Sequence, residues 1–175
     1  MRISLTNMGE RDADQWRAFV ATLRGSRRAF LAHDLNRPRP RFPEGGAFSP
    51  VAASWSQAIN ADGDAVLSLG GLLPGMPLWF GDYIGFRWDA PGAPGGSMAR
   101  KALVRVVEGV TASGGGNAVV TVEPPVPNIV PADAQAYFTK PQCLMRVVSA
   151  QLGEQVPGGY TAQGGAIEAV QDLLP

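Results

Sequence analysis

One segment near the start of the chain has the hydrophobic spacing of an α-helix. Its apolar residues recur every three or four positions and so share one face: Trp16, Phe19, Val20 and Leu23. Asp12 is placed to cap the first turn, and Gly25 is placed to end the last one. The pattern therefore predicts one amphipathic helix over residues 13 to 24.

Most of the remaining chain alternates between apolar and polar residues with a period of two, as β-strands do. The clearest alternation is in DAVLSL and AVVTVE. Strands are predicted near residues 3–5, 28–33, 64–69, 81–88, 102–110, 118–123, 134–139 and 143–149. Glycine and proline separate these short segments. About seven to eight short antiparallel strands with one flanking helix predict a mainly β fold, either a β-sandwich or a small β-barrel.

The predicted strands lie within residues 1–150, which we expect to form a single β-rich domain. Two loop excursions interrupt it, at 36–58 and 89–100. The first begins with a crossing rich in proline and arginine, which we expect to be extended and exposed. Residues 151–175 are expected to form a glycine-rich C-terminal extension, whose end, AIEAVQDLLP, predicts a short amphipathic turn.

Composition limits the class of partner. The chain has 175 residues, of which 45% are hydrophobic, and its 15 basic and 15 acidic residues give a net charge of zero. The chain therefore has no net positive charge that would attract it to nucleic acid or to an anionic membrane. No apolar run reaches the roughly 20 residues that span a bilayer, and the N-terminal segment lacks the apolar core of a signal peptide. We expect a protein made in the cytoplasm that does not contact a membrane.

Candidate catalytic chemistry is sparse. Cys143 and His33 are single residues of their types, so a cysteine–histidine nucleophile would depend on both. A buried structural cysteine and a surface or interface histidine are the favoured interpretations. Asp62 and Asp64 resemble the start of a calcium loop, but the closing glutamate is missing, which favours an Asp-Gly hairpin.

The glycine-rich segment TASGGGN, residues 111 to 117, also has a structural interpretation. It lacks the lysine and the following serine or threonine of a phosphate-binding loop, so a flexible hairpin tip is predicted. No pair of carboxylates is singled out for acid–base chemistry. The sequence therefore predicts no catalytic, metal-binding or cofactor-binding residue.

Six arginines are concentrated between residues 24 and 41. They are the candidate interface residues of the chain: Arg24, Arg27, Arg28, Arg37, Arg39 and Arg41. Arginine suits interface ion pairs because its planar guanidinium contacts a carboxylate at two points. Nucleic-acid binding remains the alternative, but aromatic residues are sparse among these arginines and the whole chain is neutral.

The order of several segments resembles one family. ADQWRAFVATLRGSRRAFLAHD, INADGDAVLSLGGLLPG, FGDYIGF and the segment from 102 to 149 follow one another along the chain. Together they resemble distal tail, or tail-hub, proteins of long-tailed bacteriophages. The resemblance rests on a helix with W-x-x-F and a closing L-R-G, a G-D-Y strand, and a hairpin that runs into a P-P corner and an A-D turn.

This resemblance implies a structural virion protein without catalytic residues. It implies a homo-oligomeric ring, usually of six copies, at the distal end of the tail. The ring would join the tail tube protein to the hub or baseplate, the fibres and the receptor-binding parts, after assembly in the host cytoplasm. The implied fold is a β-sandwich or barrel with a helix on its flank.

Two other classes of function stay open. The first is a small carbohydrate- or ligand-binding β module, whose stacking candidates are Trp55, Trp79, Tyr83 and Trp88, although core packing is favoured for these aromatic residues. The second, less favoured, is a cysteine hydrolase that depends on Cys143.

Overall fold

The computed structural model describes residues 2–5, 8–34, 36–41, 48–89, 100–155 and 161–173. These residues form thirteen strands in antiparallel sheets and one helix, so the predicted mainly β fold with a single helix is confirmed. The chain divides into two compact units. Unit 1 comprises Met1–Leu31 and Leu144–Asp172, and unit 2 comprises Ala32–Cys143 and Leu173–Pro175. This division differs from the expected single domain over residues 1–150.

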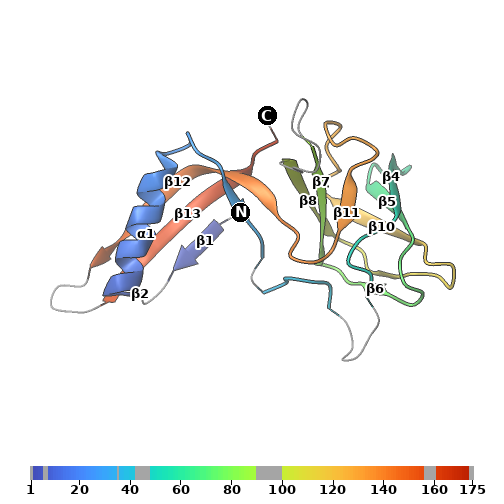
Figure 1. The fold of residues 1–175 in the computed structure, drawn as a ribbon, viewed down its shortest axis with the longest axis horizontal. Coiled ribbons are helices and arrows are strands. Elements are labelled where there is room, and N and C mark those ends of the chain that lie inside the picture. The colour runs from blue at the N-terminus through green and yellow to red at the C-terminus, as the bar shows by residue number, and fades with distance from the viewer. Residues whose placement is uncertain are drawn as a thin grey trace. The chain divides into compact units, whose positions relative to one another are not determined.

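In unit 1 a helix lies on one face of an antiparallel sheet (Figure 1). The helix is α1 (Glu10–Leu23), and the two long strands beneath it are β12 (Cys143–Gln155) and β13 (Thr161–Gln171). The shorter strands are β1 (Arg2–Leu5), β2 (Met8–Gly9) and β3 (Phe30–Ala32). The strand order is β1-β13-β12-β3, and β2 also pairs with β13.

Helix α1 begins three residues earlier than the sequence pattern predicts. Gly9 is its N-cap residue and makes no side-chain cap hydrogen bond, so the predicted cap at Asp12 is wrong. Asp12 lies inside the first turn instead, where a carboxylate interacts favourably with the helix dipole. The predicted end is confirmed, because Arg24 and Gly25 follow the last turn with positive φ angles of 49° and 67°.

The apolar face of α1 packs against the sheet as its spacing predicts. Trp16 and Leu23 are buried, whereas Phe19 is partly exposed. The Trp16 indole donates a hydrogen bond from Nε1 to the Gln151 carbonyl at 3.4 Å. Gly165 on β13 leaves room for this indole, since a Cβ at that position would lie 3.0 Å from Trp16 Nε1.

The C-terminal segment is a strand, and the predicted amphipathic turn is wrong. Ile167 is fully buried in β13, opposite Ile3 of β1 and Ala150 of β12. Burial alternates along β13, with Ala169 inside and Val170 outside, as a half-buried strand requires. Residues 161–171 therefore belong to the sheet of unit 1.

Unit 2 contains a six-stranded antiparallel sheet with the order β11-β7-β8-β10-β5-β4 (Figure 1). The strands are β4 (Ser54–Ile59), β5 (Ala65–Gly70), β7 (Tyr83–Trp88), β8 (Arg100–Val106), β10 (Ala118–Glu123) and β11 (Gln135–Tyr137). A separate pair consists of β6 (Pro77–Leu78) and β9 (Val110–Thr111). Every strand predicted from residue 64 to residue 139 therefore has a counterpart in this unit.

Hydrogen bonds join the two edges of the six-stranded sheet. Val51 forms a β-bridge with Tyr137, and the Ala52 N–H donates to the Ala136 carbonyl at 3.1 Å. Trp55 on β4 donates from Nε1 to the carbonyl that precedes β11, at 2.8 Å. The sheet thus curls toward a small barrel. Fully buried apolar side chains fill it, among them Leu67, Ile84, Phe86, Val104, Val120 and Val122.

The Asp-Gly hairpin between β4 and β5 is confirmed. Asn60 closes the loop, because its Oδ1 accepts hydrogen bonds from the backbone N–H groups of Asp62, at 3.0 Å, and Asp64, at 2.8 Å. Gly63 has a φ of 90°, which favours glycine. The two aspartates therefore serve a turn, as the sequence indicated.

Two other loops are more tightly packed than predicted. The 111–117 segment is not a free hairpin tip, since the Leu72 N–H donates to the Gly116 carbonyl at 2.9 Å. A side chain on Gly116 would overlap the Leu72 carbonyl oxygen. The proline- and arginine-rich crossing is not wholly exposed, because Pro40 is buried. Residues 42–46 of this crossing, 90–99 of the second excursion and 156–160 of the C-terminal segment lie outside the described residues.

A glutamine side chain holds the proline-rich corner at the sheet edge. Pro124 and Pro125 have no N–H to donate, so the ladder of β10 ends at Glu123. Val126 is the next residue with an N–H, and it is buried. Gln57 on β4 accepts from that N–H at 2.6 Å and donates to the Val126 carbonyl at 3.2 Å. The side-chain amide thus takes the place of a neighbouring strand.

Replacing Gln57 with alanine should lower the free energy of unfolding by about 2 kcal/mol, because a buried N–H and a buried carbonyl lose their partner. Urea denaturation followed by tryptophan fluorescence measures the change. The control is Ser56→Ala at an exposed neighbouring position, with an expected change below about 0.5 kcal/mol. Equal stability of the two variants would mean that water satisfies Val126 as well as Gln57 does.

Candidate functional site

The six candidate interface arginines do not form one cluster. The chain passes from unit 1 to unit 2 between Leu31 and Ala32, in the middle of the arginine-rich stretch. The first three arginines follow α1 in unit 1 and the last three belong to unit 2: Arg24, Arg27 and Arg28, then Arg37, Arg39 and Arg41. Each trio therefore has its own surroundings.

In unit 1 the three arginine side chains are exposed just after the end of α1. Arg146 of β12 fixes the backbone of this turn. Its Nη1 donates to the carbonyls of Ser26, at 2.9 Å, and Arg27, at 3.3 Å. Its Nε donates to Asp172 Oδ2 at 2.7 Å. The turn thus presents exposed positive charge on a backbone that the sheet holds in place.

Arg37 in unit 2 is part of the fold rather than a free surface charge. Its Nη1 donates to the Phe80 carbonyl at 2.9 Å and lies 3.6 Å from Asp82 Oδ1. Asp82 is 1% exposed, and its Oδ2 accepts a hydrogen bond from the Trp79 N–H at 2.8 Å. A buried carboxylate and an arginine therefore close the turn that contains the G-D-Y motif, whereas Arg39 and Arg41 are exposed.

The same turn explains the glycine and the aspartate of the motif. Gly81 has a φ of 82°, and a side chain there would overlap the Arg37 guanidinium. Burial raises the pKa of Asp82, because desolvation outweighs the opposing effects of the Trp79 and Arg41 N–H groups and of the Arg37 and Arg41 charges. The motif is thus structural in this chain.

The candidate residues for catalysis have structural surroundings. Cys143 is buried as predicted, and burial raises the pKa of its thiol to about 11, whereas a nucleophilic cysteine requires a lowered pKa. His33 directly follows β3 and is half-buried. In the part of the chain that the structure describes, no three His, Cys, Asp or Glu side chains are grouped to hold a metal ion. The described residues also include no helix of the length and apolarity that a bilayer requires.

The four aromatic candidates for sugar stacking differ in exposure. Trp55 is half-buried and packs against the core of unit 2, and Trp88 is 7% exposed. Tyr83 lies beneath the Arg105 guanidinium, 5.9 Å from it. Trp79, in contrast, is 51% exposed. Core packing therefore accounts for Trp55 and Trp88 but not for Trp79.

Trp79 and Phe80 form an exposed aromatic pair, which we call the aromatic knob. Phe80 is 67% exposed. Their backbone is firmly held, because Asp82 binds the Trp79 N–H, Arg37 binds the Phe80 carbonyl, and the next N–H donates to the Val106 carbonyl at 2.6 Å. Sequence reasoning missed Phe80, for which two consecutive large aromatics before a turn glycine were the available signal.

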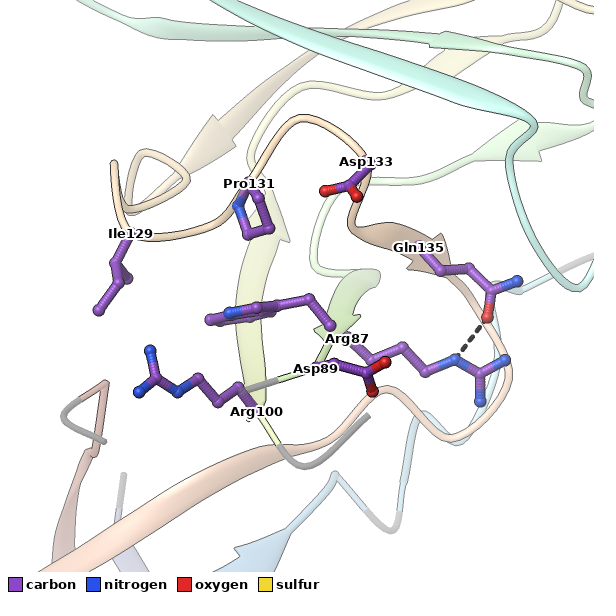
Figure 2. Close-up of a pocket in the computed structure, with 8 residues that line it drawn as sticks. Arg87, Asp89, Arg100, Ile129, Pro131, Asp133 and Gln135 are labelled. Carbon is purple, nitrogen blue, oxygen red and sulfur yellow. Dashed lines mark hydrogen bonds between the residues drawn. The ribbon is translucent and has the colours of Figure 1, made fainter. Parts of the chain in front are cut away.

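A cavity of about 600 Å³ lies beside the C-terminal end of β7 (Figure 2). The aromatic knob precedes the other end of this strand. Its apolar lining consists of Trp88, Ile129 and Pro131. Ile129 and Pro131 lie on the loop that follows the proline-rich corner, and Ile129 is 41% exposed. We call this cavity the β7 pocket. No pattern in the sequence predicts it.

Five polar residues complete the β7 pocket: Arg87, Asp89, Arg100, Asp133 and Gln135. Figure 2 shows Asp133 on the same side as Pro131, with Arg87, Asp89 and Arg100 across from them. Arg87 Nε donates to Gln135 Oε1 at 2.5 Å. Asp89 and Asp133 are exposed, while Arg100 Nε is buried and has no hydrogen-bond partner among the described residues. The pocket thus combines an apolar wall with two arginines and two exposed carboxylates.

Comparisons of the chain with protein-family models, curated proteins and solved structures find no match. The resemblance to distal tail proteins therefore rests on the motif residues alone. In the structure these residues hold turns and edges of unit 2, around Asp82 and Val126, and form the apolar face and the end of α1 in unit 1. Function is inferred from this geometry and from the exposed side chains.

Proposed function

We propose that this chain is a structural virion protein that forms a ring at the distal end of a phage tail. The proposal rests on one observation. The turns that contain the family motifs are held by hydrogen bonds to the backbone, while large apolar side chains remain exposed. Exposed apolar groups on a chain without net charge favour association with other proteins. The chain thus acts by assembly and not by catalysis.

The proposed partners are further copies of the chain, the tail tube protein, and the hub or baseplate with its fibres. A ring requires that one patch of each copy meets a different patch of the next copy. Unit 1 contributes the exposed arginines after α1, and Val148 and Val170 on its sheet are 66% and 55% exposed. These surfaces support a role in contacts between proteins.

Microscopy of the native particle tests the proposal directly. Purified protein should form rings under negative stain, and gold-labelled antibodies against the chain should mark the tip of the tail. A protein that stays monomeric at high concentration, and that mass spectrometry does not detect in purified particles, would contradict the proposed function.

Charge reversal after α1 should weaken the ring more than the fold. In Arg27→Glu/Arg28→Glu we expect at least a tenfold loss of self-association by sedimentation velocity. The melting temperature should change little, since both side chains are exposed. Arg2→Glu/Arg11→Glu makes the same change of charge at exposed positions elsewhere in unit 1 and serves as the control. Equal loss of assembly and of stability would contradict a specific interface role.

The ligand-binding alternative is supported by one observation, the β7 pocket. An apolar wall with arginine and carboxylate groups is a suitable lining for a sugar or another small ligand. A glycan array tests it. Binding that is lost in Asp133→Ala, a change at an exposed position, would favour this alternative over the ring.

A further inference from the structure

The aromatic knob and the β7 pocket lie at opposite ends of one strand. The knob directly precedes the turn into β7, whereas Arg87 and Trp88 are its last residues. At about 3.3 Å per residue, the six-residue strand separates the two ends by about 17 Å. Gly81 also binds Val106 at one end of β8, while Arg100, at the other end of β8, lines the pocket. The knob therefore cannot enter the pocket of its own chain.

The knob and the pocket match in size and polarity. A cavity of about 600 Å³ is in the range that proteins use to enclose a small ligand, which also suits one or two aromatic rings. Trp88, Ile129 and Pro131 give the pocket an apolar wall. Among the described aromatic residues of unit 2, Trp79 and Phe80 are the two that are more than half exposed. Burying them would remove a large apolar area from water.

One pair of charges on the two surfaces is complementary. Arg105 is exposed at the base of the knob, where a Cβ on Gly81 would lie 3.1 Å from its Nη2. In the pocket, Asp133 presents an exposed carboxylate on the opposite side from Arg87 and Arg100.

We propose that the aromatic knob of one copy of this chain inserts into the β7 pocket of the next copy. Since the two surfaces are different and lie apart, the contact is head-to-tail and continues from copy to copy. Such a chain of contacts closes into a ring if the rotation between copies allows it. The inference deepens the proposed function and rests on it for the closure of the ring.

Two assembly-defective variants and their mixture test this contact. Trp79→Ser/Phe80→Ser removes the knob and keeps the pocket, whereas Ile129→Arg/Asp133→Arg blocks the pocket and keeps the knob. All four side chains are exposed, so both variants should fold, which circular dichroism checks. The control is Ile59→Ser/Val119→Ser, which removes two apolar side chains that are each 58% exposed elsewhere in unit 2.

Sedimentation velocity should show oligomers for the wild type and the control. Each assembly-defective variant alone should associate at least about 100-fold more weakly, the loss typical of a central aromatic contact. Mixed in equal amounts, the two variants should form a heterodimer and nothing larger. The intact knob of one variant binds the intact pocket of the other, and no further intact knob or pocket is left in the pair. Variants that assemble like the wild type, or a mixture that stays monomeric, would overturn the inference.

The outcomes also separate this inference from the proposed function. Rings at the tail tip that persist in both variants would keep the function and reject the contact. If the protein forms oligomers that depend on the knob but is absent from virions, the contact would be kept and the proposed function rejected. A wild type that is monomeric but binds anionic vesicles or glycans through Trp79 would overturn the contact and assign the knob to that ligand.

Discussion

Gly85→Ala is expected to lower the free energy of unfolding by about 3 kcal/mol, although it adds only one methyl group. Gly85 is buried in β7 opposite Tyr137 of β11, and the Tyr137 ring lies over it. A Cβ on Gly85 would lie 2.6 Å from Tyr137 Cζ. The ring cannot withdraw easily, because its hydroxyl accepts from the Gln142 N–H at 2.9 Å and donates to the Gln142 carbonyl at 3.2 Å. Urea denaturation measures the loss.

A double-mutant cycle identifies the cause of that loss. In a Tyr137→Ala background, Gly85→Ala should cost at least about 2 kcal/mol less than in the wild type. Gly114→Ala is the control, because a Cβ there would meet nothing within 4 Å. Additive effects of Gly85→Ala and Tyr137→Ala would show that the strain lies in the backbone of β7 and not in the contact with the ring.

Asp82→Ala is expected to cost about 3 kcal/mol. The change leaves the Trp79 N–H without its acceptor and Arg37 without the carboxylate beside it. Both groups are needed to hold the turn before β7, so the tryptophan fluorescence of the folded state should change as well. Asp62→Ala, at an exposed position in the β4–β5 loop, is the matched control and should change stability by less than about 0.5 kcal/mol.

Asp82→Asn separates the charge of this residue from its hydrogen bond. The amide oxygen of asparagine still accepts from Trp79, so the loss at pH 7 should be smaller than for alanine. Burial raises the folded-state pKa of Asp82 above 3.8, so the folded protein takes up this proton at a higher pH than the unfolded chain does. As pH falls from 7 through the folded pKa, the wild type should gain stability relative to Asp82→Asn. An unchanged difference between pH 7 and pH 4 would contradict the raised pKa.

Most of the strands and the helix could be predicted from the period of the hydrophobic pattern. Strand β10 has the predicted bounds of 118–123, because Ala118, Val120 and Val122 share one buried face and prolines follow at once. The α1 stripe was equally clear, and only its first turn was misplaced, since Gly9 provides no side-chain signal of a cap. Where local pattern and burial agree, the sequence was sufficient.

The segments that were missed depend on partners far away in the chain. AIEAV fits one turn of a helix as well as a strand, and β13 is a strand because β1 and β12 flank it. β4 was missed because its side chains are mostly exposed or half-buried, so they show little alternation. Its neighbour β5 and the Gln57 contact with Val126 define it instead. Long-range pairing of this kind leaves little trace in local sequence.

The candidate sites illustrate the same limit. The arginines are neighbours in sequence, yet they belong to two units, and Arg37 faces a buried carboxylate. The β7 pocket combines residues around 87–89, Arg100 and 129–135, which no spacing connects. Exposure of the aromatic knob was also hidden, since tryptophan beside phenylalanine usually indicates a core.

Unit 1 consists of two segments that lie far apart in the chain, and this affects when it can fold during translation. Its helix precedes unit 2 in the chain, but the strands beneath it come from residues 144–172. Unit 2 is almost continuous in sequence and has its full set of strands earlier. While the ribosome synthesises unit 2, Trp16 and Leu23 have no sheet to cover them. Nascent chains stalled before β13 should therefore expose these side chains to chaperones, although unit 2 has already folded.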